Sequence, residues 1–371
     1  MKYINKILTF IIFAVIFSAC NRDEIFEREM YKSRVSLNGV LTNGFNVFLQ
    51  QHDLTPFFGT PLKSEDSYTG WTSAFIAGNV GGSLPTEQDI VLTIVEDMDL
   101  LFDYNWTNYE LEDFRYARAL SKDRYQIPDM KIVIPAGQRA GVMEFRVRLE
   151  GLSPDTVYFL PLRIEHSSAY EVNHEKSSVL YRAQIRNEWA TQSPTVDYAH
   201  RGFILETERL IDGFRNPLLT VDGDTIRPQR TPTYRAKRVV PLSRNEIRLN
   251  VGNEATSTAR RDDQEIPRLS IKITIEDYNP EIEYLTPSMR KVTITQWNPT
   301  HIGPSIIQVD DDYYDKSDLF LNTYELIEDD FGRRYHTFRL CYDYIVREPQ
   351  QGLSEQRRIW EELRFQYIEV R

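Results

Sequence analysis

The feature that most constrains the fold is an alternation of apolar and polar residues with period two, which recurs along much of the chain. In residues 142–149 the odd positions hold Met, Phe, Val and Leu, while three of the four even positions hold charged residues. Residues 90–95 and 158–164 repeat the pattern. Successive side chains of a β-strand point to opposite faces, so this period predicts half-buried strands. We find no amphipathic helix longer than three turns, and the sequence therefore predicts an all-β protein.

Turn signals divide these strands into two domains. Pro135-Ala136-Gly137 and Gly151-Leu152-Ser153-Pro154 separate short strands, a spacing typical of an immunoglobulin-like β-sandwich, which we place at residues 31–190. Thr191-Gln192-Ser193-Pro194 opens a predicted linker, residues 191–205. Residues 206–371 predict a second antiparallel β-domain, which could be a barrel, a lipocalin-like fold or another sandwich. Within it, residues 354–362 fit either a short helix or a hairpin turn.

The N-terminus predicts export and lipidation. Lys2 and Lys6 precede an apolar run, residues 7–17, that is too short to span a bilayer but suits a signal peptide. Phe17-Ser18-Ala19-Cys20 then resembles a bacterial lipobox, which implies cleavage before Cys20 and acylation of that residue. We expect a signal peptide over residues 1–19 and an acylated tether over residues 20–30, anchored in the outer membrane. Asn21-Arg22-Asp23-Glu24 resembles the acidic export signal of Bacteroidetes surface lipoproteins, so we expect the cell-surface face.

Composition excludes several classes of protein. The chain has 44 Lys and Arg against 55 Asp and Glu, a net charge of −11. Loss of Lys2 and Lys6 with the signal peptide would make it −13. A surface this acidic argues against nucleic-acid binding. With Cys20 acylated, Cys341 has no second cysteine for a disulfide, and two cysteines cannot build a cysteine-rich zinc site. We predict no cofactor.

The sequence contains no motif of a known catalytic site, so we expect a protein that is not an enzyme. Nucleophile-elbow, zinc-protease, Walker and dinucleotide-binding motifs are all absent from it. Two acids at a suitable separation could still form an unmarked glycosidase site. The densest acidic cluster, Asp310 to Asp312 with Asp315 and Asp318, departs from the spacing of a calcium loop. We interpret it as a solvated loop and predict no metal.

Aromatic residues are the remaining candidates for ligand binding. Trp and Tyr rings stack on the apolar faces of sugars, while amides and carboxylates bind the hydroxyl groups. One aromatic and polar cluster, interpreted as a loop, lies at residues 104–109, and another comprises a strand-end tryptophan and the acidic loop. Each aromatic could equally be a core residue of a β-protein. The candidate ligand-binding residues are Tyr104, Trp106, Tyr109, Trp297, Tyr313 and Tyr314.

Four landmarks carry a resemblance to a known family: residues 103–105, Ile132 to Gly137, Tyr158 to Leu162, and Asn187-Glu188-Trp189. Together they resemble the immunoglobulin-like domain that precedes the catalytic barrel of some Bacteroidetes family-18 endoglycosidases. Here that barrel is missing. Residues from about 195 to 371 resemble an uncharacterised β-domain of lipoproteins from polysaccharide-utilisation loci. The resemblance implies a glycan-binding or accessory role beside an outer-membrane glycan transporter.

The sequence thus favours a non-catalytic surface lipoprotein that binds an oligo- or polysaccharide as an accessory to its uptake. The alternative is a structural or protein-interaction lipoprotein of adhesin-like character, and a glycoside hydrolase is the least favoured function. Exposed aromatic side chains gathered in one concave patch would favour glycan binding. A flat apolar patch would favour a protein partner.

Overall fold

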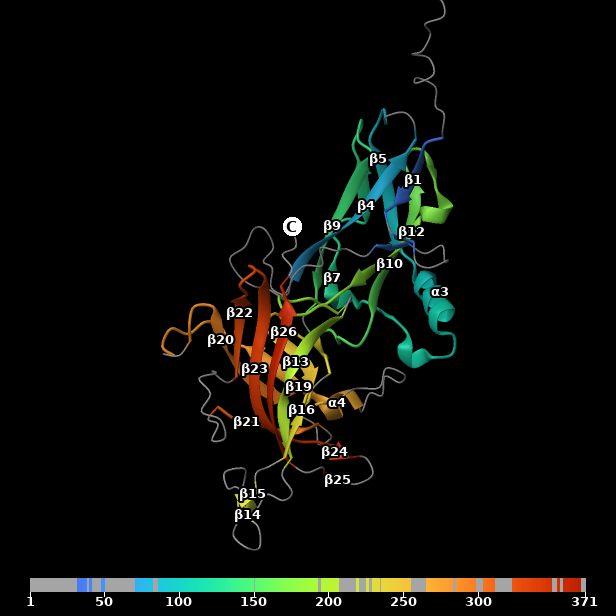
Figure 1. Ribbon diagram of the computed structural model, residues 1–371. Helices are drawn as coiled ribbons and strands as arrows, with labels where there is room; N and C mark the ends of the chain where they lie inside the picture. Colours follow the sequence, from blue (N-terminus) through green and yellow to red (C-terminus); the bar gives the residue numbers. More distant parts are fainter. Residues whose placement is uncertain are drawn as a thin grey trace, which may run out of the picture. The chain divides into compact units, whose positions relative to one another are not determined.

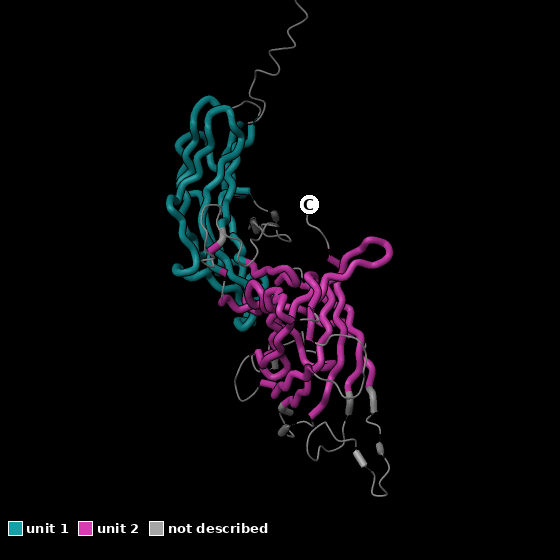
Figure 2. Tube along the Cα trace, turned by 90° about the vertical axis from the view of Figure 1, so that its left-hand side faces the viewer, with its two compact units in different colours: residues 1–54, 73–148, 157–183 teal, residues 55–72, 149–156, 184–371 magenta. Residues whose placement is uncertain are grey.

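The computed structural model describes residues 32–38, 40–41, 48–50, 71–82, 86–149, 151–192, 195–206, 218–219, 225–226, 229–233, 235–254, 265–282, 285–297, 303–310, 322–348, 352–353 and 356–367. The chain divides into two compact units (Figure 2). The N-terminal unit comprises residues 1–54, 73–148 and 157–183, and the C-terminal unit comprises residues 55–72, 149–156 and 184–371. The predicted signal peptide and tether, including Cys20, lie outside the described residues.

The N-terminal unit contains two sheets (Figure 1). The first sheet has the order β11-β1-β4-β9-β7, with β11 (Glu171–Val172), β1 (Arg34–Leu37), β4 (Trp71–Gly81), β9 (Ala140–Arg148) and β7 (Tyr125–Gln126). The second has the order β2-β3-β12-β10-β5-β8, with β2 (Val40–Leu41), β3 (Phe48–Gln50), β12 (Ser178–Ala183), β10 (Tyr158–Ser167), β5 (Ile90–Glu96) and β8 (Lys131–Ile134). The short strand β6 (Arg118–Ala119) pairs with β10.

The two sheets bury their alternating faces against each other. Every second residue of β9 is buried while the residues between are exposed, as the period-two pattern predicts. Phe145 of β9 meets Tyr181 of β12 edge to face, with ring centroids 5.0 Å apart. A Cβ on Gly78 of β4 would lie 2.8 Å from Leu92 of β5, so the facing sheet leaves no room for a side chain at this position. The predicted β-sandwich is confirmed.

One helix interrupts the sandwich. Helix α3 (Met98–Tyr109) follows β5, and its Leu101 packs against Phe159 of β10 and Leu180 of β12. Its 12 residues make slightly more than three turns, so the prediction that residues 104–109 form a loop is wrong. The helix could not be detected from the spacing of its apolar residues, because several of them face solvent. The short 3-10 helices are η1 (Asp113–Arg115), η2 (Lys122–Arg124) and η3 (His174–Lys176).

The C-terminal unit is a closed barrel of eight antiparallel strands. Around the barrel they are β13 (Val196–Glu206), β17 (Lys237–Pro241), β18 (Glu246–Asn250), β19 (Ser270–Ile275), β20 (Met289–Gln296), β22 (Thr323–Glu328), β23 (Arg334–Ile345) and β26 (Arg357–Gln366). Strand β26 pairs with β23 on one side and with β13 on the other, which closes the barrel and removes its sheet edges. The domain is therefore a closed antiparallel barrel, and of the alternatives left open for it the sandwich is wrong.

Smaller elements surround the barrel. Strand β16 (Gln229–Pro232) pairs with β13, and β21 (Ser305–Gln308) pairs with β23. Helix α4 (Glu265–Leu269) precedes β19. Two short hairpins are formed by β14 (Leu218–Leu219) with β15 (Thr225–Ile226), and by β24 (Arg347–Glu348) with β25 (Gly352–Leu353). Within the described ranges, no helix combines the length and apolar character that crossing a bilayer requires.

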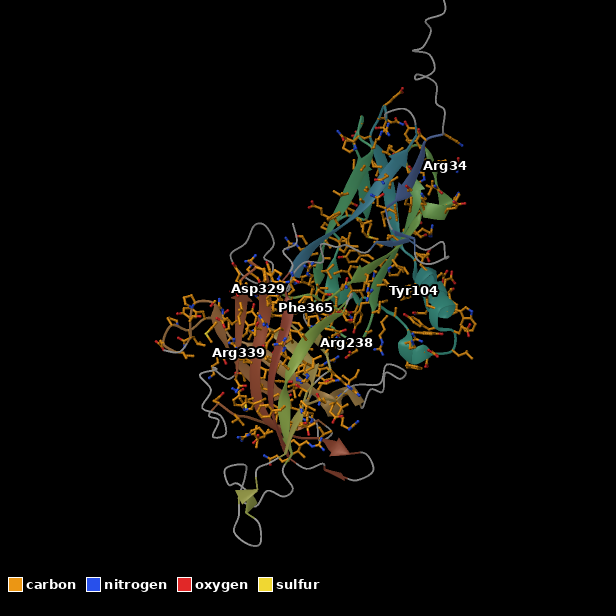
Figure 3. The ribbon with its side chains drawn as sticks, viewed as in Figure 1. Arg34, Tyr104, Arg238, Asp329, Arg339 and Phe365 are labelled. Atoms are coloured by element: carbon orange, nitrogen blue, oxygen red, sulfur yellow. The ribbon has the colours of Figure 1, made fainter. Side chains whose placement is uncertain are left out.

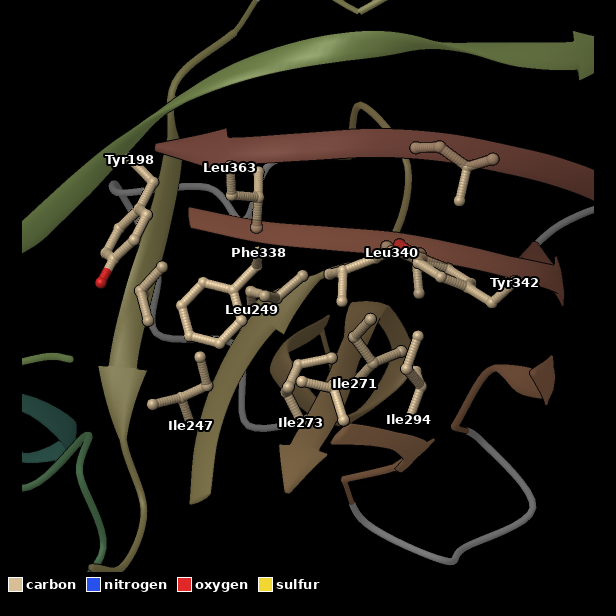
Figure 4. Close-up of a cluster of buried hydrophobic side chains, with 14 of the residues drawn as sticks. Tyr198, Ile247, Leu249, Ile271, Ile273, Ile294, Phe338, Leu340, Tyr342 and Leu363 are labelled. Atoms are coloured by element: carbon tan, nitrogen blue, oxygen red, sulfur yellow. The ribbon is translucent and has the colours of Figure 1, made fainter. Parts of the chain in front are cut away.

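A cluster of apolar side chains lies inside the barrel (Figure 4). Ile247 and Leu249 of β18, Ile271 and Ile273 of β19, and Phe338 of β23 are all buried in it. These are the alternate positions of each strand, so the same period-two pattern that predicts the strands also selects their inward faces.

Two predictions about this unit are wrong. Residues 196–206, within and just beyond the predicted linker, form β13, and residues 357–362, left open between a helix and a turn, belong to β26. Both strands carry a polar residue at a buried position, His200 in β13 and Glu361 in β26. An inward histidine or glutamate breaks the apolar alternation by which a strand is detected in sequence.

Candidate functional site

Helix α3 is held in place by capping and by a buried amide. The Asp97 side chain accepts a hydrogen bond from the backbone N–H of Asp99 at 3.2 Å, which satisfies one free donor of the first turn. In the helix interior, Asn105 Nδ2 donates to the backbone oxygen of Ala117 at 2.9 Å, and Ala117 N donates back to Asn105 Oδ1 at 2.8 Å. This reciprocal pair fixes the rotation of α3, and thereby determines which side chains face outward.

An apolar stripe lies on the exposed side of α3. Met98, Phe102 and Trp106 are 53%, 65% and 52% exposed, and their spacing of four residues places them along one side of the helix. We call these three residues the α3 stripe. Leu111 and Phe114, just beyond the helix, are also exposed large apolar residues. Such a cluster is unusual for a surface that contacts only water.

Two carboxylates accompany the stripe. Asp99 and Asp103 are exposed, and each precedes an aromatic of the stripe by three residues, Phe102 and Trp106 respectively. Residues three apart on a helix are neighbours on its surface. The stripe therefore combines flat apolar rings with hydrogen-bond acceptors beside them, the combination that a sugar ring requires.

Tyr104 and Tyr109, predicted together with Trp106, have a different role. Tyr104 lies on helix α3 (Figure 3). Its ring packs edge to face against Phe159, with ring centroids 4.9 Å apart, and against Tyr109 at 6.2 Å. Burial, with Tyr109 as a further cause, raises the pKa of the Tyr104 hydroxyl. The Arg115 guanidinium covers the Tyr109 ring at 5.0 Å. These two tyrosines help to hold the helix against the sandwich, whereas the Trp106 side chain is exposed to solvent.

The predicted residue Trp297 belongs to the C-terminal unit, whereas Tyr104, Trp106 and Tyr109 belong to the N-terminal unit. Trp297 lies at the end of β20, and the Arg248 guanidinium lies over its ring at 4.5 Å. Arg248 is itself held by Asp155 through two hydrogen bonds of 2.6 Å. One face of the Trp297 ring is therefore occupied. Tyr313 and Tyr314 lie outside the described residues, and so does most of the acidic loop.

A pocket in the barrel unit was not predicted from the sequence. It has a volume of about 240 Å³, and the residues around it come from β13, β17, the segment before β17, the end of β18 and the segment after it. Eight of the lining residues carry charged or polar side chains: Asp197, His200, Arg235, Lys237, Arg238, Asn250, Asn253 and Glu254. We call it the barrel pocket.

A buried ionic cluster lies beside the barrel pocket. Glu361 accepts an ion-pair hydrogen bond from Lys237, lies 2.8 Å from His200 Nε2, and accepts from the Tyr342 hydroxyl at 3.0 Å. Burial alone would raise the pKa of Glu361, but Lys237 and His200 more than offset this, so the pKa lies below its usual value. Burial lowers the pKa of Lys237, and Glu361 offsets part of that effect.

No local motif could have revealed this cluster, because its members are far apart in sequence. Strand register assembles them: Tyr198 pairs with Lys237 across β13 and β17, and Gly202 pairs with Glu361 across β13 and β26. A carboxylate whose pKa is lowered is a poor general acid, since a glycosidase needs one acid with a raised pKa. Among the described residues, no three His, Cys, Asp or Glu side chains are arranged to hold a metal ion.

Two family models match the sequence. One describes an N-terminal domain and matches residues 58–171, and the other describes a C-terminal domain and matches residues 177–364. The second match alone spans just over half of the 371 residues. The chain belongs to this family of paired N- and C-terminal domains. A search of curated protein sequences finds no match.

Solved structures from Bacteroides share the fold of this family member. A protein of unknown function from Bacteroides ovatus is 14% identical with a TM-score of 0.55, and the alignment covers 90% of this chain and 94% of the other. A structure described as an auxiliary nutrient binding protein from Bacteroides thetaiotaomicron is 14% identical with a TM-score of 0.53, covering 88% and 94%. Another Bacteroides ovatus protein of unknown function is 13% identical with a TM-score of 0.51, covering 93% of each chain. At such identities the likeness establishes the architecture alone.

Proposed function

We propose that this protein is a non-catalytic lipoprotein of the outer-membrane surface that binds glycan as an accessory to polysaccharide uptake in a member of the Bacteroidetes. The observation that carries the proposal is the α3 stripe, whose Phe102 and Trp106 rings face solvent beside carboxylates. The lipobox-like sequence before Cys20 supports the anchor. The structural neighbour described as an auxiliary nutrient binding protein supports the class of function.

The geometry of the stripe suits a short stretch of sugar chain. Four residues of α-helix rise about 6 Å, so the Phe102 and Trp106 rings are spaced for two stacking contacts along one chain. Asp99 and Asp103 would accept hydrogen bonds from the sugar hydroxyls. Individual contacts of this kind are weak, but many lipid-anchored copies on one surface bind a long polysaccharide with avidity. An outer-membrane glycan transporter would then receive the captured chain.

The same stripe also gives the protein-interaction alternative a specific basis. With Leu111 and Phe114 it becomes a larger exposed apolar patch, and such patches often mark protein interfaces. The carboxylates one turn from each ring make glycan the better-supported ligand. A hydrolase receives no support from the barrel, because the buried acid Glu361 has a lowered pKa.

A glycan panel tests the proposal. The mature chain from residue 21 onward, made without lipid, would be screened against host, plant and microbial polysaccharides by affinity electrophoresis, and hits would be measured by calorimetry. One stacked ring contributes about 1 kcal/mol, so Phe102→Ala and Trp106→Ala should each weaken binding about fivefold. Phe331→Ala, which removes an even more exposed aromatic from the other unit, should bind like the parent protein.

The outcomes separate the three functions. Binding that is lost in the α3 variants but kept in Phe331→Ala, with no sugar released on long incubation, supports the proposed function. Release of sugar would show a hydrolase instead. Absence of binding to every glycan would overturn the proposal and leave the protein-interaction alternative.

A further inference from the structure

The barrel pocket has the size and position of a site for one small polar molecule. Its volume of about 240 Å³ is below the range of roughly 300–1,000 Å³ that accommodates drug-sized ligands, which suits a single sugar ring. Its lining includes both buried and exposed residues. His200 and Lys237 are almost fully buried and form part of the floor, while Asp197, Arg235 and Arg238 are exposed at its rim.

Buried side chains of His200, Lys237 and Glu361 form a close ionic cluster beside the barrel pocket. His200 Nδ1 lies 3.1 Å from the backbone oxygen of Arg235, which can only accept, so Nδ1 donates. The other ring nitrogen, Nε2, lies 2.8 Å from Glu361 Oε2 but has no hydrogen-bond partner among the described residues. Lys237 forms an ion pair with the same carboxylate oxygen. The Glu361 carboxylate is therefore already paired with a cation, and it is not among the residues that line the pocket.

The rim supplies groups for both charge and hydroxyl recognition. The Arg238 guanidinium lies 3.5 Å from the Asp197 carboxylate, and both side chains are more than half exposed, so this ion pair is weak and can open towards a ligand. Arg235 adds a second exposed guanidinium at the rim. Asn253 Oδ1 is buried against the pocket with no hydrogen-bond partner among the described residues. A ligand hydroxyl would satisfy that acceptor.

We propose that the barrel pocket binds a carboxylated monosaccharide, such as a hexuronate at the end of a glycan chain. Guanidinium groups recognise carboxylates through paired, charge-assisted hydrogen bonds, which assigns Arg235 and Arg238 to the ligand carboxylate. Asn250, Asn253 and Glu254 offer donors and acceptors for ring hydroxyls. The choice of a sugar rests on the proposed function, whereas the site and the acidic class of ligand are additional to it. This places glycan recognition on both units, with neutral chain stacking at α3 and an acidic residue in the barrel.

Calorimetry with monosaccharides tests the inference on the same mature chain. Glucuronate and galacturonate should bind, while glucose and galactose, which lack the carboxylate, should bind at least about tenfold more weakly. Arg238→Ala and Arg235→Ala should each weaken uronate binding by a similar factor, and Asn253→Ala should also reduce it. Arg146→Ala, which removes an exposed arginine from β9, is the matched control and should leave binding unchanged. Thermal melts would confirm that each variant is folded.

Two results would overturn the inference: failure of both uronates to bind, or binding that Arg235→Ala and Arg238→Ala leave intact. Acetate that binds as tightly as the uronates would also overturn it, because the pocket would then recognise a carboxylate and not a sugar. Trp106→Ala keeps the two proposals distinguishable. It should weaken polysaccharide binding without affecting uronate binding, so either site can fail while the other stands.

Discussion

At the residue scale, the two buried histidines of the barrel unit, His200 and His336, have different neighbours. His200 lies beside the Glu361 carboxylate and belongs to an ionic cluster. His336 is surrounded by aromatic rings: the Tyr324 hydroxyl is hydrogen-bonded to its Nδ1 at 2.9 Å, and Tyr367 packs edge to face against it at 5.2 Å. Burial lowers the pKa of His336 to about 4. The two imidazoles thus lie in different surroundings, one ionic and one aromatic.

His336 should make the protein less stable as the pH falls. Its pKa is about 4 in the folded protein and 6.5 when unfolded, so between these values the unfolded chain gains a proton that the folded chain excludes. The stability is complete above pH 6.5 and is lost progressively as the pH approaches 4, by about 3 kcal/mol from this residue. Urea unfolding at pH 7.0, 5.5 and 4.5 would measure the loss.

His336→Gln isolates this contribution. Glutamine keeps an acceptor for the Tyr324 hydroxyl but does not titrate, so the variant should lose less stability between pH 7.0 and 4.5 than the parent protein. Equal losses in the two proteins would contradict the assignment. A difference in unfolding free energy at pH 7.0 alone would reflect packing and not protonation.

At the scale of the elements, β13 is the strand that joins the parts of the barrel. Its first residues pair with β17, its middle pairs with β26, and its last residues pair with both β26 and β16. Gly202 directly precedes the residues that pair with both β26 and β16. Its φ of +148° is one that residues with a side chain rarely adopt. A Cβ there would lie 1.9 Å from the backbone oxygen of Trp360 on β26. The barrel seam therefore depends on the absence of a side chain at one position.

Gly202→Ala should destabilise the barrel by about 2–3 kcal/mol, because backbone strain and a clash with β26 combine. Gly332→Ala is the matched control: its φ is +75°, but nothing lies within 4 Å of the added Cβ. That variant should cost only about 1 kcal/mol, from the backbone alone. Urea titrations of the two variants would compare them, and equal costs would show that contact with Trp360 is unimportant.

Helix α3 shows why an element can be missed in sequence. Asp97 is a good helix cap and could have indicated the start, but Asn105 is buried while Phe102 and Trp106 are exposed. This inverts the usual distribution of polarity on a surface helix. Trp106 could be identified as a candidate from its residue type. The exposure that distinguishes it from Tyr104 is decided by contacts with β10 and with Ala117.

At the scale of the whole molecule, the proposed function depends on attachment to the membrane. The mature chain would carry a charge of −13, which disfavours attraction to anionic lipid headgroups. Acyl chains on Cys20 would therefore be the main source of membrane affinity, and several chains hold a protein far more firmly than one.

Cys20→Ala should abolish anchoring. We expect the parent protein in the outer-membrane fraction, labelled by radioactive fatty acid, and the variant unlabelled and absent from that fraction. Protease treatment of intact cells would then test the surface location, since an inward-facing protein would be protected. Labelling of the Cys20→Ala variant would show that another residue carries the lipid.

The sequence alone determined the all-β class, the alternating faces of the strands and the two-part organisation, because side-chain period is a local property of the backbone. It also gave Trp106 as one of six candidate ligand-binding residues, by residue type. Only the tertiary structure decided that the second domain closes into a barrel, since closure depends on the pairing of β13 with β26, more than 150 residues apart. The same long-range register brings His200, Lys237 and Glu361 together. Buried polar residues on those strands weaken the local pattern, and their chemistry emerges only when distant strands are paired.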